Sequence, residues 1–137
     1  MSLVIDSSIT LASVYSHEIS QAVTAVLQMV KAGGAWAPSL WRLEVAHVLE
    51  MGVRRGRHDV AFRDATLSDL AMLPVSIDLE TEKHAWGATL PLAERHRLTL
   101  YDATYLELAK RRGLRLASLD TELRTAAQRE GLPLLGM

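Results

Sequence analysis

Short apolar runs alternate with amphipathic stretches along the whole of this 137-residue chain, and this alternation limits the folds open to it. Short runs bounded by turn residues are typical of buried strands, whereas apolar residues at i, i+3, i+4 and i+7 predict helices. The predicted strands cover residues 3–5, 35–37, 74–77, 115–119 and 133–135. The predicted helices cover residues 19–33, 38–56, 59–72, 79–95, 102–112 and 121–129, with Pro91 expected to kink or interrupt the fourth.

Strands separated by helices predict a largely parallel sheet covered on both faces, because each crossover must be long and right-handed. The fold class is therefore α/β, a three-layer α/β/α sandwich, and the length predicts a single domain over residues 1–137. In such sheets ligands bind beyond the carboxyl ends of the strands, near the point where the strand order reverses. Functional residues are expected at that edge.

Composition excludes several classes of protein. No stretch approaches the ~20 apolar residues of a membrane span, and the chain begins with an apparent strand instead of a secretory signal, so we expect a cytoplasmic protein. Cysteine is absent, which removes disulfides and thiolate metal ligands. The formal net charge of −1 permits a nucleic-acid partner without requiring one.

Four acidic residues stand at the edges of apolar segments, where an unpaired charge is costly to desolvate. Asp6, Asp102 and Asp120 each follow an apolar run, and Glu44 lies within the largely apolar residues 40–49. A hard divalent cation takes oxygen ligands and lets several carboxylates coexist. We therefore predict that these acids hold Mg²⁺ or Mn²⁺ in a catalytic site, where the ion can activate a water molecule. The substrate does not follow from the acids themselves.

Each acid also has an ordinary alternative role. Asp6 and Asp120 each precede a hydroxyl residue at an expected helix start, so both can act as N-caps. Asp102 stands at an expected helix start, where its charge can stabilise the helix through the dipole. Its side of the helix is apolar, however, which places its carboxylate toward the interior. Glu44 has no strong charge partner one turn away, which leaves a salt bridge to a distant arginine as its alternative.

Each acid lies in a longer patterned segment. The segments are Asp6-Ser-Ser, Pro38-Ser-Leu-Trp-Arg-Leu-Glu44-Val-Ala, Leu98-Thr-Leu-Tyr-Asp102-Ala-Thr-Tyr-Leu-Glu-Leu-Ala and Leu116-Ala-Ser-Leu-Asp120-Thr-Glu-Leu. Together they resemble the successive motifs of PIN-domain ribonucleases, particularly the VapC toxins of prokaryotic toxin–antitoxin pairs. The resemblance covers almost the whole chain, and the segment around Asp102 is its most specific part.

The resemblance implies a strand order of 3-2-1-4-5, which places Asp6 and Asp120 opposite each other at the switch point. Glu44 and Asp102 would close the cluster from flanking helices. It further implies a Mg²⁺-dependent endoribonuclease that acts as a toxin, is neutralised by a cognate VapB-type antitoxin and pairs into a homodimer.

The chain departs from the family pattern at two positions. His47 stands where such proteins often have asparagine, and Ser118 stands where threonine is frequent. Because the hydroxyl is kept, Ser118 and Ser8 are expected to orient a ligand or water around the acids. The part that His47 plays there is left open.

RNA binding would need basic residues near the acids. The candidates are Arg54, Arg55, Arg57, Arg95 and Arg97. Arginine is a good bidentate phosphate ligand, yet cations at helix ends also complement the helix dipole, so a purely structural role is the alternative for these residues.

Competing chemistries lack part of their motif. Glu44 and His47 form a single Glu-x-x-His, whereas a di-iron bundle needs two. A haloacid-dehalogenase-type phosphatase would have an acid in place of Ser8, and no glycine-rich nucleotide motif is present. The remaining alternatives are a catalytically silent PIN-like protein-binding module and a housekeeping PIN nuclease without an antitoxin.

Overall fold

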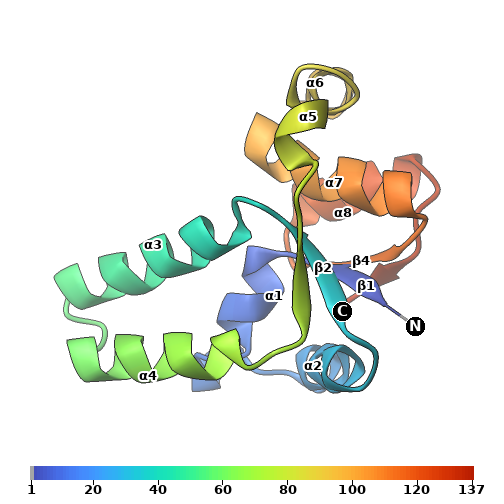
Figure 1. Ribbon diagram of the computed structural model, residues 1–137. Coiled ribbons are helices and arrows are strands. Elements are labelled where there is room, and N and C mark those ends of the chain that lie inside the picture. The colour runs from blue at the N-terminus through green and yellow to red at the C-terminus, as the bar shows by residue number, and fades with distance from the viewer. Residues whose placement is uncertain (1) are drawn as a thin grey trace.

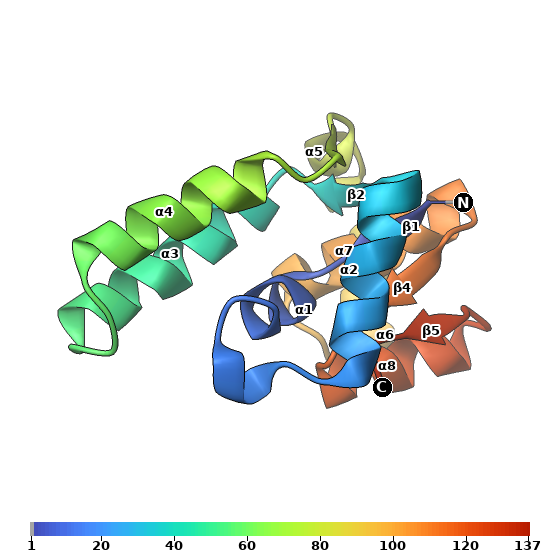
Figure 2. The same ribbon diagram turned by 90° about the horizontal axis from the view of Figure 1, so that it is seen from below.

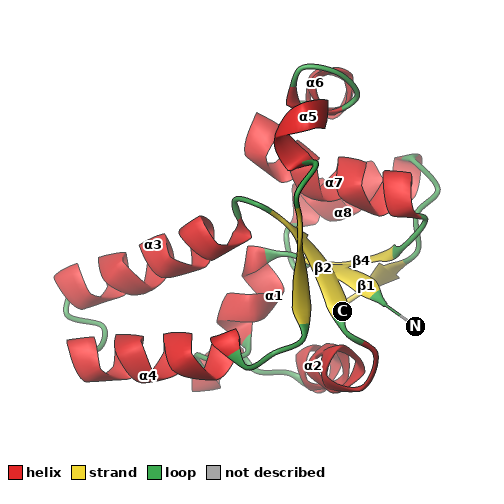
Figure 3. Cartoon of the chain, viewed as in Figure 1, coloured by secondary structure: helices red, strands yellow, loops and turns green. Residues whose placement is uncertain are grey.

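The computed structural model describes residues 2–137 as one parallel sheet flanked by helices (Figures 1 and 3). The strands are β1 (Leu3–Ile5), β2 (Ala35–Pro38), β3 (Val75–Asp78), β4 (Arg115–Ala117) and β5 (Leu134–Leu135). The helices are α1 (Ser7–Ala12), the 3-10 turn η1 (Ser16–Glu18), α2 (Gln21–Gly33), α3 (Trp41–Arg54), α4 (Val60–Ala71), α5 (Thr81–Ala85), α6 (Thr89–His96), α7 (Leu100–Arg112) and α8 (Thr121–Arg129).

The five strands run parallel in the order β3-β2-β1-β4-β5, which confirms the predicted fold class and strand order. Val4 of β1 pairs with Trp36 of β2 on one side and with Leu116 of β4 on the other. The chain therefore crosses to the other half of the sheet after β3, and the switch point lies between β1 and β4. Helix α2 covers one face and α7 and α8 the other, while α3 and α4 project to one side (Figures 1 and 2).

The core lies between the central strands and α7. All three residues of β1 are fully buried, as expected for a strand covered on both faces. Helix α7 is buried over residues 103–109, because it crosses the sheet and packs against α5, α6 and α8. Gly113 ends this helix in the left-handed conformation with φ 64°, as the sequence predicts.

Three local features differ from the sequence prediction. A helix start at Asp6 was expected, but the extent of helix α1 was not predicted, because the helix is too short to show an apolar period. The predicted helix 79–95 is two helices, α5 and α6, separated around Gly87. Pro91 does not interrupt helix α6, because it lies in the first turn. Backbone N–H groups there have no partner within the helix, so the missing N–H of proline costs no hydrogen bond.

The third difference concerns β4, which ends at Ala117 instead of residue 119, so that Ser118 and Asp120 lie in the turn beyond the strand. In the part of the chain that the structure describes, no helix combines the length and apolarity needed to cross a bilayer.

Candidate active site

Asp6 leaves the carboxyl end of β1 and begins α1. Its Oδ1 accepts the backbone N–H of Ile9 at 3.0 Å, which is the capping role that the sequence permits. The side chain is also deeply buried, with 3% of the residue exposed. Burial raises the pKa of Asp6, and the charge of Asp120 raises it further against the lowering effect of its hydrogen bonds. Asp6 is therefore both a helix cap and a strained buried acid.

Two serines hold Asp6 against the turn that follows β4. Ser118 Oγ donates to Asp6 Oδ2 at 2.5 Å and accepts the N–H of Asp120 at 3.0 Å. Ser8 Oγ donates to Asp6 Oδ1 at 2.6 Å and accepts the N–H of Leu119 at 2.9 Å. Each hydroxyl thus joins the ends of β1 and β4 and fixes both carboxylate oxygens of Asp6.

Glu44 approaches from the first turn of α3. The hydroxyl of Tyr105, on α7, donates to Glu44 Oε1. Burial raises the pKa of Glu44, and the charges of Asp102 and Asp6 raise it further. Within residues 2–137 Glu44 forms no salt bridge, so the arginine partner considered from the sequence is not there.

Asp102 stands in the first turn of α7, and Asp120 is the N-cap residue that precedes α8. Asp120 caps α8, because its Oδ1 accepts the N–H groups of Glu122 at 2.9 Å and Leu123 at 3.2 Å. Asp102 is not the cap of α7, since Thr99 Oγ1 accepts its N–H at 3.1 Å. Burial raises the pKa of Asp102, with a further rise from the charges of Asp120 and Glu122.

Each of the four acids Asp6, Glu44, Asp102 and Asp120 is linked to two others by the effect of charge on pKa, and together they form what we call the acid ring. Asp120 raises the pKa of Asp6 and of Asp102, while Asp102 and Asp6 both raise the pKa of Glu44. Acids from four separate segments therefore lie within electrostatic reach of one another at the switch point. Glu122, two residues after Asp120, is a fifth acid that the sequence reasoning missed; its position in the first turn of α8 was the available signal.

The chemistry of this donor set fits a hard cation. The available ligands are carboxylate and hydroxyl oxygens, which suit Mg²⁺ or Mn²⁺ better than softer metals. No group of three or more His, Asp or Glu side chains among residues 2–137 is already spaced to hold a metal ion. Asp6 Oδ1 and Asp120 Oδ1 each accept two hydrogen bonds, whereas Asp6 Oδ2 and Glu44 Oε1 each accept one and keep a further lone pair.

The other predicted residues are not members of this ring. His47 is exposed on α3 and lines a separate hollow with Val48 and Met51. Among the predicted arginines, Arg54 pairs with Glu50, Arg57 with Glu18 and Arg95 with Glu130. Arg55 and Arg97 are exposed at the ends of α3 and α6.

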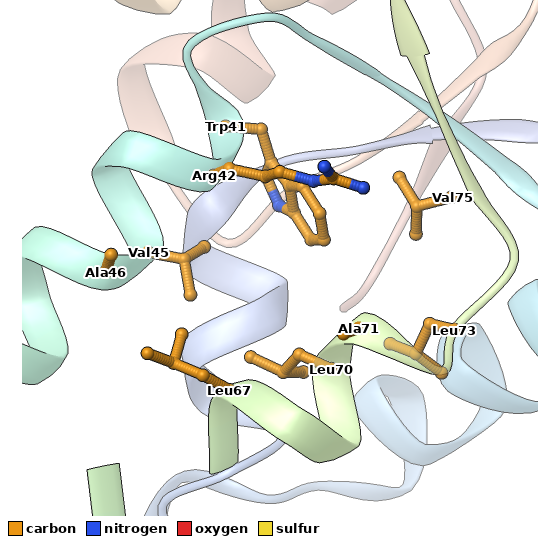
Figure 4. A pocket seen from close by; sticks show the side chains of 9 residues that line it. All are labelled: Trp41, Arg42, Val45, Ala46, Leu67, Leu70, Ala71, Leu73 and Val75. Atoms are coloured by element: carbon orange, nitrogen blue, oxygen red, sulfur yellow. The ribbon is translucent and has the colours of Figure 1, made fainter. Parts of the chain in front are cut away.

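An apolar groove of about 350 Å³ lies between α3, α4 and β3 (Figure 4). Trp41 and Val45 of α3 face Leu67 and Leu70 of α4 across it. Trp41 Nε1 donates to Thr10 Oγ1 at 3.0 Å, so the groove is tied to α1, the helix that Asp6 caps. It is a second surface feature next to the acid ring.

The fold and the site together define a parallel α/β/α domain that presents a ring of carboxylates at its switch point. A family model described as the PIN domain matches residues 3–128, and the chain belongs to the PIN domain family. The nuclease members of this family are hydrolases that act on nucleic acids.

Solved structures show the same fold at low identity. PAE2754 from Pyrobaculum aerophilum shares 24% identity with a TM-score of 0.71, over 98% of this chain and 83% of that one. VapBC2 from Rickettsia felis, bound to a DNA fragment from its promoter, shares 12% with a TM-score of 0.61, over 98% and 97%. VapC20 from Mycobacterium tuberculosis, a toxin that cleaves the sarcin–ricin loop, shares 18% with a TM-score of 0.62, over 90% and 94%. A search of curated proteins found no match.

Proposed function

We propose that this protein is a metal-dependent endoribonuclease built as a single PIN domain, and that it acts as the toxin of a toxin–antitoxin pair. The ring of Asp6, Glu44, Asp102 and Asp120 at the switch point carries the proposal. Such a concentration of one buried and three half-buried carboxylates is unfavourable for stability and is typical of a functional site. The similarity to the VapC20 toxin supports RNA as the substrate.

The four carboxylates would hold Mg²⁺ or Mn²⁺. When bound, the ion lowers the pKa of a water molecule and offsets the negative charge that develops on the phosphodiester. Ser8 and Ser118 keep Asp6 oriented, and the Tyr105 hydroxyl positions Glu44. One of the carboxylates accepts the proton that the attacking water gives up.

The cleavage assay uses single-stranded RNA with Mg²⁺ or EDTA. Asp6→Asn and Asp102→Asn are expected to abolish cleavage without unfolding the protein, because amides keep the size of the side chain and lose its charge. Asp59→Asn, at the exposed cap of α4, is the matched control and should cleave normally. Full cleavage by either site variant, or in EDTA, would contradict the proposal.

An antitoxin partner is proposed from the similarity to VapBC2. The groove between α3 and α4 is apolar and offers a surface for a peptide segment of the antitoxin. Expression of this protein alone should arrest growth, and co-expression of the product of the adjacent gene should restore it. Arrest that the adjacent product never relieves would instead indicate a nuclease without an antitoxin.

A homodimer is proposed through α3 or α4. Leu43 on α3 is 74% exposed, and Val60 and Phe62 are exposed on α4. Sedimentation equilibrium of the wild type and of Leu43→Ser should distinguish a dimer from a monomer. A monomer at all concentrations would exclude it.

A further inference from the structure

A cavity of about 500 Å³ opens directly beside the acid ring. Its lining includes Ser8, Tyr15, Glu18, Val48, Arg57 and Leu119. Ser8 donates its hydrogen bond to Asp6, and Leu119 directly precedes Asp120. A molecule in this cavity would therefore lie one side chain away from the carboxylates. The volume is within the ~300–1,000 Å³ range of small-molecule sites.

The guanidinium of Arg57 forms a flat, preorganised wall of this cavity. Its Cζ lies 3.5 Å from the centre of the Tyr15 ring. Its Nη2 lies 3.2 Å from His17 Nε2 and 3.6 Å from Glu18 Oε1. The side chain is nevertheless 40% exposed, so a surface remains open to a ligand. Because Arg57 is already held in place, binding to it costs little conformational entropy.

The support beneath Arg57 is itself packed. The Tyr15 hydroxyl is 2.9 Å from His58 Nε2, and the Tyr15 ring stacks on Phe62 with centroids 6.3 Å apart. Gly52 of α3 leaves room for the His58 ring, which a Cβ at that position would strike. Residues from η1, α3 and α4 thus combine to fix one arginine beside the acid ring.

A second hollow of about 250 Å³ continues from the first along α3. Val48 and Arg57 line both hollows, and the second adds His47, Met51 and Arg55. Glu18 lines the first hollow and pairs with Arg57, whereas no acid lines the second hollow, which adds Arg55. The surface is continuous, with an acidic end, an apolar middle and a basic end.

We propose that these two hollows bind the nucleotide next to the scissile phosphate of a single-stranded RNA, an inference that rests on the proposed ribonuclease function. The unpaired base enters the apolar part of the first hollow and stacks on the Arg57 guanidinium, as bases do on planar cations. Arg55 and His47 lie where the following phosphate would pass. A duplex does not fit, because its bases are stacked within the helix.

The test measures binding and cleavage separately. Binding of a fluorescein-labelled single-stranded RNA pentamer is followed by anisotropy in the Asp102→Asn background, where the proposed cleavage is blocked. Arg57→Ala should weaken binding about tenfold through loss of the stacked base. Val48→Trp should weaken binding comparably, because the larger side chain protrudes into the two hollows that Val48 lines, while Val48 takes no part in the contact between Arg57 and Tyr15.

Arg112→Ala is the matched control. Its guanidinium lies 3.4 Å from the centre of the Trp36 ring and lines neither hollow. It therefore removes one positive charge and one arginine–aromatic stack elsewhere in the molecule. Its affinity for the pentamer should stay within about twofold of the background.

The outcomes separate the two proposals. Unchanged binding by both Arg57→Ala and Val48→Trp would overturn the subsite, and so would wild-type KM values for RNA cleavage in both. Weakened binding with no cleavage by the wild type would support the subsite while refuting the ribonuclease. If an acidic heptapeptide loses affinity in these variants and RNA does not, the hollows bind a peptide and the proposal is wrong.

Discussion

The sharpest test of the acid ring is Asp120→Asn, because Asp120 has both a structural and a proposed functional role. Its Oδ1 accepts two N–H groups at the start of α8, and an asparagine oxygen can accept both. The substitution therefore keeps the cap and loses only the interaction of the charge with the helix dipole, about 0.3–1 kcal/mol. It also removes a charge that raises the pKa of Asp6 and of Asp102. The two effects oppose each other, so the metal-free protein should lose less than about 1 kcal/mol.

The effect of Mg²⁺ should differ clearly between the two proteins. At a Mg²⁺ concentration of ten times Kd, the wild type gains about 1.4 kcal/mol of unfolding free energy. A tenfold loss of affinity in Asp120→Asn reduces that gain to about 0.4 kcal/mol at the same concentration. Urea denaturation with Mg²⁺ or EDTA, at constant ionic strength, measures both values.

Asp59→Asn is the control, because Asp59 caps α4 in the same way through the N–H of Phe62 but lies outside the acid ring. Asp59→Asn should gain as much unfolding free energy from Mg²⁺ as the wild type does. The reasoning is refuted if Asp120→Asn keeps the full gain, or if it loses several kcal/mol without metal while Asp59→Asn does not.

Three further predictions follow from individual contacts. Arg111→Met should reduce the unfolding free energy by about 3–5 kcal/mol, because it leaves the buried Glu107 carboxylate unpaired and leaves Asp78 with only the longer contact to Arg112, at 3.8 Å. Urea denaturation beside the exposed Arg129→Met, expected within about 0.5 kcal/mol, checks it. In the wild type, the hydrogen bond from Tyr105 lowers the pKa of Glu44. Tyr105→Phe removes this bond, so the pKa of Glu44 should rise and the acid limb of the pH–activity profile should move to higher pH. An unmoved limb would exclude Glu44 as the titrating group. Lys110, with His96 and Arg95, lowers the pKa of Glu130 from 4.5 to about 2. The ionised Glu130 therefore stabilises the folded protein above pH 4.5, and this contribution is lost as the pH falls toward 2. In acid unfolding, Glu130→Gln should not show this pH-dependent loss of unfolding free energy.

Much of the fold was predictable from local pattern. The fully buried β1 shows as an uninterrupted apolar run, and α8 covers the residues that its period and its acidic cap predict. Strand order came from the family resemblance, since no local pattern states which strands are neighbours. The extent of helix α1 and the division of residues 79–95 were missed, because a short helix has no period and Gly87 is a weaker signal than Pro91.

The four acids were identified from the sequence because a charge at the edge of an apolar run is costly whatever the fold. Their approach to one another, the serine bridges of Asp6 and the Tyr105–Glu44 hydrogen bond link residues 61 to 112 positions apart. Such contacts exist only once the sheet is formed, and the hydrophobic periodicity of the sequence does not predict them. The same holds for Arg57, whose contact with Tyr15 depends on the turn between α3 and α4 packing against η1.

The sequence by itself determined the α/β layering and the acids that need compensation, because hydrophobic period and desolvation act on each segment separately. The tertiary structure decided which acids influence one another, which arginines are paired and where the hollows lie. These properties depend on distances between segments remote in sequence, which are set only when the strands meet at the switch point between β1 and β4.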